Sequence, residues 1–281
     1  MMKKYLELTR FEHTIFALPF ALASIALLYE GMPPFWKLFW VILAFVSART
    51  AGMALNRLID LPIDELNPRT KEWIHVRGEV SREEIKRLII FSSGLFMFSS
   101  FMINLHAFLL SPIVLFLLWF YPYAKRITYY PHFVLGMIYL LIPLAVDVCF
   151  NERFSLNALI LGLAMGSWVA GFDILYALQD YNFDKSYGLK SIPVKFGIEG
   201  ALSISRLLHL LTFIFLLLLA FRVEFLGFFY LLGLLAIAGF LYYEHSLIKP
   251  NDLSKINKAF FTVNGYISMI FFLVVLLDRL L

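Results

Sequence analysis

A long apolar run near the start of the chain closes with residues 49–64, Arg-Thr-Ala-Gly-Met-Ala-Leu-Asn-Arg-Leu-Ile-Asp-Leu-Pro-Ile-Asp. The polar residues Arg49, Asn56 and Asp60 are seven and then four positions apart, and Asp64 follows after four more. This spacing predicts that they share one face of a helix. Because carboxylates are costly beside hydrocarbon, acids in this place indicate a functional site rather than an ordinary surface.

A second acidic cluster closes another apolar run. Asp180 and Asp184 are again four residues apart, and Asp173 precedes them by seven. Two such helix faces, if they oppose each other, form an oxygen-rich cage that suits Mg²⁺ and a diphosphate. The alternative is that both are solvated helix ends of an ordinary membrane protein. Two matched clusters favour a site.

The composition is that of an integral membrane protein. Of the 281 residues, 61% are hydrophobic and only 16% are charged, whereas about a quarter are charged in soluble domains. The N-terminus lacks the pattern of a cleaved signal peptide. The single cysteine, Cys149, cannot form an intrachain disulfide. No segment looks like a second domain, so we expect one transmembrane domain over residues 1–281.

The hydropathy pattern predicts an all-α, polytopic fold with nine transmembrane helices. They cover roughly residues 13–29, 36–58, 87–104, 107–122, 132–150, 156–179, 201–221, 225–247 and 259–280. Pro62 is expected to end the second helix. The acidic clusters close the second and sixth helices, which predicts two similar four-helix halves, about 10–125 and 130–250, plus a ninth helix.

The basic residues predict the orientation in the membrane. Short and long linkers alternate, and the long ones lie at 60–86, 123–131, 180–200 and 248–258. The N-terminus and these long linkers, with their flanking helix ends, carry nineteen Lys or Arg, against four on the opposite side. By the positive-inside rule the N-terminus and both acidic clusters are cytoplasmic and the C-terminus lies outside. We expect the membrane to be the cell inner (plasma) membrane.

Several basic residues are candidates for binding an anion. Most of the loop charges fit attraction to lipid head groups, but Lys125, Arg126 and Arg69 are placed to hold phosphate oxygens. Arg49 lies inside a predicted span, so it either pairs with a carboxylate such as Asp173 or holds an anionic substrate.

Aromatic residues are abundant, with 30 Phe, 14 Tyr and 5 Trp. Tyr139, Trp168 and Tyr176 are candidates for lining a cavity and for stabilising a carbocation, although packing explains them equally well. The sequence contains no P-loop, GxSxG, HExxH or CxxC motif. We expect membrane lipids, and no nucleic acid, among the partners.

Four motifs resemble the UbiA superfamily of intramembrane prenyltransferases, and the resemblance covers nearly the whole chain. It is most similar to 4-hydroxybenzoate polyprenyltransferases and related enzymes of menaquinone synthesis. The motifs are residues 48–70, which end in Asn-Pro-Arg-Thr; Arg10-Phe-Glu-His-Thr14; Tyr121-Pro-Tyr-Ala-Lys-Arg126; and residues 173–184, with Ser191-Ile-Pro193 beyond them.

The resemblance implies nine helices around a central cavity with a cytoplasmic cap, and Mg²⁺ bridging both aspartate motifs to a polyprenyl diphosphate. Carried over by motif position, the metal ligands are Asn56, Asp60, Asp64, Asp180 and Asp184. Lys125 and Arg126 would support the diphosphate. Arg49 and Arg10 are candidates for gripping the carboxylate of an aromatic hydroxy acid acceptor, and Asp173 is a candidate base. One departure is Trp73, where the family often has Arg.

The resemblance implies prenylation of 4-hydroxybenzoate in ubiquinone or menaquinone biosynthesis. Alternative acceptors are 1,4-dihydroxy-6-naphthoate, a glyceryl phosphate lipid, haem or chlorophyllide. A transporter would instead need acids across the membrane. Asp147, near the opposite side, is the only outlier of that kind.

Overall fold

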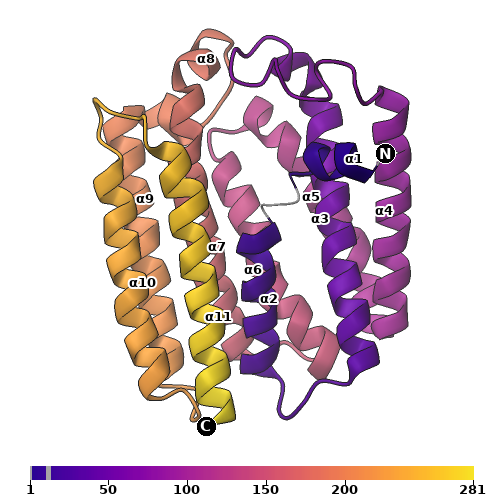
Figure 1. Cartoon of the computed structure of the whole chain (residues 1–281), viewed down its shortest axis with the longest axis vertical. Coiled ribbons are helices and arrows are strands. Elements are labelled where there is room, and N and C mark those ends of the chain that lie inside the picture. Colours follow the sequence, from indigo (N-terminus) through magenta and orange to yellow (C-terminus); the bar gives the residue numbers. More distant parts are fainter. Residues whose placement is uncertain (1, 11–13) are drawn as a thin grey trace. The chain divides into compact units, whose positions relative to one another are not determined.

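The computed structural model describes residues 2–10 and 14–281, and this described part consists of helices joined by turns and loops, with no strand beyond one isolated bridge between Lys249 and Asp252. The elements, labelled in Figure 1, are α1 (Met2–Leu8), α2 (Thr14–Leu28), α3 (Phe35–Asp64), α4 (Arg82–Ile103), α5 (Leu105–Ile127), α6 (Pro131–Asn151), α7 (Leu156–Ala177), η2 (Leu178–Asp180), α8 (Tyr181–Ser186), α9 (Ile192–Ala220), α10 (Phe228–Leu247), η3 (Lys258–Val263) and α11 (Asn264–Leu280). The predicted all-α fold is confirmed.

Eight helical stretches among the described residues are long and apolar enough to cross a membrane, by length and composition. The shorter apolar helix Ala17–Leu28 lies in α2, where the first span is predicted. The count of nine spans and the cytoplasmic cap stay predictions. Residues 11–13, which belong to the N-terminal motif and to the start of the first predicted span, lie outside the described residues.

The chain forms two compact units. The first comprises Met1–Thr14 and Pro33–Ala124, and the second comprises Ile15–Met32 and Lys125–Leu281. The second unit therefore includes nearly all of α2, whereas the predicted halves divide the chain near residue 128. The internal similarity of those halves stays a prediction.

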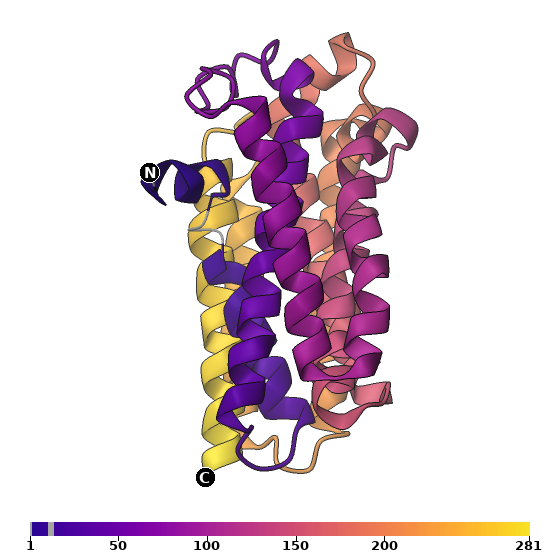
Figure 2. The same ribbon diagram turned by 90° about the vertical axis from the view of Figure 1, so that its right-hand side faces the viewer.

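In the first unit α3 and α4 pack along each other, as Figures 1 and 2 show from two sides. A small buried cluster of Leu8, Ala54, Ile74, Val80 and Ile85 joins α1, α3, α4 and the loop between α3 and α4. The cap of α4 adds polar contacts, because the side chain of Ser81 accepts from the backbone N–H of Glu84 and the Glu84 carboxylate accepts from Lys4. These contacts hold the loop against the end of α3 that carries the acids.

Glycine residues allow the backbones of α6 and α7, in the second unit, to lie close together. A Cβ atom added to Gly136 of α6 would lie 2.6 Å from the carbonyl oxygen of Gly166 of α7, and one added to Gly166 would lie 2.8 Å from that of Gly136. Backbone atoms cannot move aside, so these positions require glycine. Gly162, one turn before Gly166, makes a similarly close approach to the backbone of Leu140. Small residues thus set the distance between α6 and α7.

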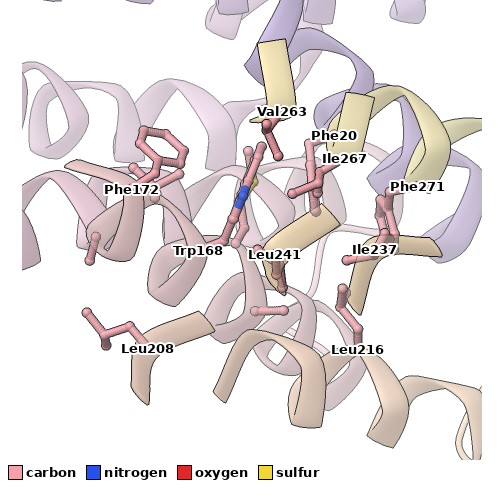
Figure 3. Close-up of a cluster of buried hydrophobic side chains, with 14 of the residues drawn as sticks. Phe20, Trp168, Phe172, Leu208, Leu216, Ile237, Leu241, Val263, Ile267 and Phe271 are labelled. Carbon is pink, nitrogen blue, oxygen red and sulfur yellow. The ribbon is translucent and has the colours of Figure 1, made fainter. Parts of the chain in front are cut away.

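The core of the second unit joins α2, α7, α9, α10 and α11 (Figure 3). Phe20 of α2 stacks against Trp168 of α7, with ring centroids 5.0 Å apart, and against Phe271 of α11 at 4.5 Å. Trp168 is 1% exposed, and its indole N–H donates to the Asn264 side-chain oxygen at 2.7 Å. Trp168 is therefore a core residue, which agrees with the packing alternative for this position.

Two helices, α3 and α5, extend beyond the predicted spans at both ends. α3 continues through Pro62 to Asp64, so the predicted stop at Pro62 is wrong. A proline removes one backbone donor, and Pro62 lies exposed in the last turns of the helix. α5 runs to Ile127, so most of the predicted 123–131 linker is helical. After α7, a 3-10 turn leads into α8. The predicted site residues of these segments are consequently on helices rather than on loose loops.

Candidate active site

The acid face of α3 is buried. Asp60 and Asp64 are 4% and 6% exposed. Asn56 donates from Nδ2 to Oδ2 of Asp60 at 3.0 Å, one turn along the helix. Arg49 lies about two turns before Asn56 on the same helix, and its guanidinium donates to the backbone carbonyl of Arg10 at 3.2 Å. Because a buried carboxylate needs compensating partners, this face is a specific arrangement and not a solvated helix end.

Asp64 is held by the loop that follows it. Its Oδ2 lies 3.0 Å from Nε2 of His75, which is 4% exposed. Its backbone carbonyl accepts from the Thr70 hydroxyl at 2.8 Å. Asn67, within the Asn-Pro-Arg-Thr turn, accepts the backbone N–H of Arg69 on its side-chain oxygen at 2.9 Å. This turn brings the chain back so that His75 reaches the carboxylate.

Three arginines surround the ring of Trp73. The guanidinium carbons of Arg57, Arg69 and Arg10 lie 4.1, 5.3 and 5.4 Å from the ring centroid, within cation–π range. Arg57 is 6% exposed, and its Nε donates to the carbonyl of Leu8 at 3.3 Å. We call Arg10, Arg57, Arg69 and Trp73 the arginine cluster. It gives the loop side of α3 a concentrated positive charge suited to phosphate or carboxylate oxygens.

In the second unit Asp173 has a histidine partner. Its Oδ2 lies 2.7 Å from Nδ1 of His132, which is 3% exposed. Asp180 closes the 3-10 turn η2, and Asp184 lies in α8. Both of these acids are half-buried. The predicted single helical face therefore holds for the acids of α3, whereas in the second cluster the helix changes type between them.

The basic residues of the second unit divide into two groups. Lys125 and Arg126 lie in the last turn of α5 and are half-buried. The backbone of Lys190 donates to the carbonyl of Lys125 at 2.7 Å, and its ammonium donates to the carbonyl of Ile127 at 3.0 Å. Lys195 donates to the Tyr130 hydroxyl at 2.7 Å. Lys190 and Lys195 thus stabilise the loops, while Lys125 and Arg126 stay candidates for binding phosphate.

The predicted metal ligands are divided between the two units. Asn56, Asp60 and Asp64 belong to the first unit, and Asp180 and Asp184 to the second. Within the part of the chain that the structure describes, no group of three or more His, Cys, Asp or Glu side chains is placed to hold a metal ion. The joint cage stays a prediction.

Asp147 has a structural role. It is fully buried, and its two oxygens accept from the Asn151 side chain at 2.7 Å and from the backbone N–H of Ser155 at 2.6 Å. It therefore closes the turn between α6 and α7. The one acid that supported a transport pathway is explained by this turn.

The family model for the UbiA prenyltransferase family matches residues 17–273. The chain belongs to this family. Among UbiA relatives, the 4-hydroxybenzoate octaprenyltransferase of Pasteurella multocida (strain Pm70) is 31% identical over 275 residues, which cover 95% of this chain and 92% of the relative. That of Aliivibrio fischeri (strain MJ11) is 31% identical over 250 residues, 88% of this chain and 85% of the relative.

Solved UbiA structures share the fold. The apo structure of a UbiA homologue from Aeropyrum pernix K1 aligns with a TM-score of 0.85 and 32% identity, over 95% of this chain and 98% of that one. A homologue from Archaeoglobus fulgidus was solved bound to GPP and Mg²⁺. It aligns with a TM-score of 0.75 and 21% identity, over 99% of this chain and 100% of that one. This chain is thus an integral, multi-pass membrane protein of the UbiA family.

Sequence reasoning missed His75, His132 and the role of Arg57. No spacing rule links His75 to Asp64, or His132 to Asp173, because each pair joins different segments. Trp73 was noticeable as a departure from the family pattern. The contacts of its ring with three guanidiniums could be seen only in the structure.

Proposed function

We propose that the protein transfers a polyprenyl group from a polyprenyl diphosphate to a ring carbon of 4-hydroxybenzoate, in quinone biosynthesis. The observation that carries the proposal is the buried acid face of α3, formed by Asn56, Asp60 and Asp64, on the same unit as the arginine cluster. Carboxylates bind the metal of a metal diphosphate, and guanidiniums bind its phosphate oxygens. The two octaprenyltransferase relatives support the choice of acceptor.

Mg²⁺ fits the residues present. Asn56, Asp60 and Asp64 offer oxygen donors, which this ion prefers, and we propose Asp180 and Asp184 as the second group. The homologue from A. fulgidus with this fold was solved with GPP and Mg²⁺. When bound, the metal neutralises charge on the leaving diphosphate.

The basic residues have two proposed tasks. Arg69, Arg57, Lys125 and Arg126 place positive charge where the diphosphate departs, which stabilises the transition state electrostatically. Arg49 and Arg10, which contact each other, hold the carboxylate of the acceptor.

The transfer breaks one C–O bond and one C–H bond and forms one C–C bond. The allylic C–O bond breaks and its electron pair leaves with the diphosphate. The ring carbon beside the phenol supplies the electron pair of the new C–C bond. Asp173 takes the ring proton, and the electrons of the C–H bond restore the aromatic ring. The apolar helices exclude water, which would otherwise capture the allylic cation.

We also propose that the protein lies in the plasma membrane with its N-terminus and site on the cytoplasmic side and its C-terminus outside. The asymmetry of Lys and Arg between the two sides supports this orientation.

The proposal is tested with Asp60→Asn, Asp180→Asn and, as a matched control, Asp252→Asn, whose carboxylate lies in an exposed loop. Each purified variant is assayed for prenyl transfer to 4-hydroxybenzoate with Mg²⁺. We expect Asp60→Asn and Asp180→Asn to lose at least about 100-fold in kcat, because each removes charge at the site of the leaving group. Asp252→Asn should behave as wild type. Full activity in either site variant would contradict the metal assignment.

A further inference from the structure

Asp173 and His132 form a hydrogen-bonded pair in the second unit. Asp173 lies on α7, and His132 is the second residue of α6. The Oδ2–Nδ1 distance is 2.7 Å, and the two side chains are 15% and 3% exposed. A contact this short to a buried imidazole restricts the rotamers of both side chains.

The other nitrogen of His132 identifies its tautomer. The backbone N–H of Ile192, the first residue of α9, donates to Nε2 of His132 at 3.4 Å. A ring nitrogen that accepts a hydrogen bond carries no hydrogen, so the hydrogen of this neutral imidazole is on Nδ1. His132 therefore donates to Asp173, and Asp173 accepts as a carboxylate.

The hydrogen bond leaves one oxygen of Asp173 available. Oδ2 is engaged by His132, and no hydrogen bond from the described residues reaches Oδ1. The start of α9 orients the imidazole, and the imidazole orients the carboxylate. A base held by such a chain presents its second oxygen in a constant direction, as a proton acceptor must.

We propose that His132 is a positioning residue that orients the Asp173 carboxylate for removal of the ring proton. The inference rests on the proposed function, in which Asp173 takes that proton. His132 itself exchanges no proton in this step. It holds Oδ2, so that Oδ1 accepts the proton while the electrons of the C–H bond return to the ring.

Two substitutions separate the two nitrogens of the ring. His132→Asn places an amide near the position of Nδ1, where it can donate to Asp173. His132→Gln places its amide near the position of Nε2, where it can accept from Ile192 but cannot replace Nδ1. His132→Ala removes both contacts, and His106→Ala, at an exposed histidine of α5, is the control.

The experiment measures prenyl transfer to 4-hydroxybenzoate and to the same acid deuterated at both carbons beside the phenol. We expect kcat to fall about 10- to 100-fold in His132→Gln and His132→Ala, with both KM values within about threefold of wild type. His132→Asn should recover most of kcat. A deuterium isotope effect on kcat should appear or increase in the two slow variants, because proton removal then limits the rate.

A purely structural role gives a different result. His132→Asn would then be as impaired as His132→Ala, and deuteration would change no variant more than wild type; this pattern would overturn the inference. Failure of the proposed function is distinguishable, because the wild-type protein itself would then form no prenylated 4-hydroxybenzoate. Thermal unfolding of each variant, compared with His106→Ala, reports any loss of folded protein separately.

Discussion

Asp64 is supported by one hydrogen bond that the acid motif does not contain, the contact of its Oδ2 with Nε2 of His75. Partners of metal-binding carboxylates orient them, and their removal typically costs 10- to 100-fold in affinity or activity, as a rough range. We expect His75→Ala to lower kcat/KM for the polyprenyl diphosphate by about that factor. His75→Gln, whose amide reaches the position of Nε2, should retain most activity.

The measurement is a steady-state assay of both variants over a titration of Mg²⁺. The apparent affinity for Mg²⁺ should weaken in His75→Ala and recover in His75→Gln. Equal activity of His75→Ala and wild type at all Mg²⁺ concentrations would show that Asp64 needs no support from this histidine.

Trp73 contacts three guanidiniums, so its removal should loosen the arginine cluster. Each cation–π contact stabilises by about 0.5–2 kcal/mol. We expect Trp73→Ala to raise KM for the polyprenyl diphosphate about three- to tenfold. Trp73→Phe keeps an aromatic face, so its KM should lie between those of wild type and Trp73→Ala. Trp36→Ala, at a half-exposed tryptophan of α3, is the control. An unchanged KM in Trp73→Ala would remove the ring from any role in organising the arginines.

Spacing along one helix predicted the Asn56–Asp60 pair, because residues four apart are neighbours on a helix. His75 and Asp64 are 11 residues apart, and His132 and Asp173 are 41 apart. Such pairs depend on how a loop returns or how two helices pack. The sequence of a single helix carries no information about that, so these two histidines could not be predicted.

At the scale of elements, α10 depends on a cap from another helix. Asp278 of α11 accepts from the backbone N–H groups of Gly227 at 2.7 Å, Tyr230 at 2.8 Å and Phe229 at 3.2 Å. These donors at the start of α10 have no helical partner of their own. One side chain therefore satisfies three backbone groups of another helix.

Asp278→Ala leaves these donors without their acceptor, and we expect the free energy of unfolding to fall by about 1–3 kcal/mol. Asp278→Asn retains one oxygen and should have an intermediate effect. Thermal unfolding in detergent measures both, with Asp252→Ala as the exposed-loop control. A melting temperature equal to that of wild type would contradict the capping role.

The apolar helix interiors were predictable and the helix ends were not. Hydropathy reports which residues suit hydrocarbon, and a helix can continue beyond that zone. α3 passes Pro62 and reaches Asp64, and α5 reaches Ile127, because polar helical turns are compatible with the aqueous side. In α9, Gly197 adopts a positive φ of 73°, which breaks the helix before the predicted span begins. The pattern of apolar residues on which the prediction rests does not report such a break in the backbone.

At the scale of the whole molecule, the proposed orientation predicts which linkers can be labelled from each side. Cys149 is buried and is the only cysteine, so Cys149→Ser provides a background without thiols. Ser254→Cys, in a long linker, should react with a membrane-impermeant maleimide only in inverted vesicles. Arg153→Cys, in a short linker, should react in intact cells. The opposite pattern would reverse the proposed topology.

One assay tests the proposed aromatic prenyl transfer. Purified protein is incubated with a polyprenyl diphosphate and either 4-hydroxybenzoate or 1,4-dihydroxy-6-naphthoate, with Mg²⁺ or with EDTA. We expect a prenylated product from 4-hydroxybenzoate that forms with Mg²⁺ and is lost with EDTA. Product from the naphthoate alone would contradict the acceptor, and no product from either acid in Mg²⁺ would contradict aromatic prenyl transfer itself.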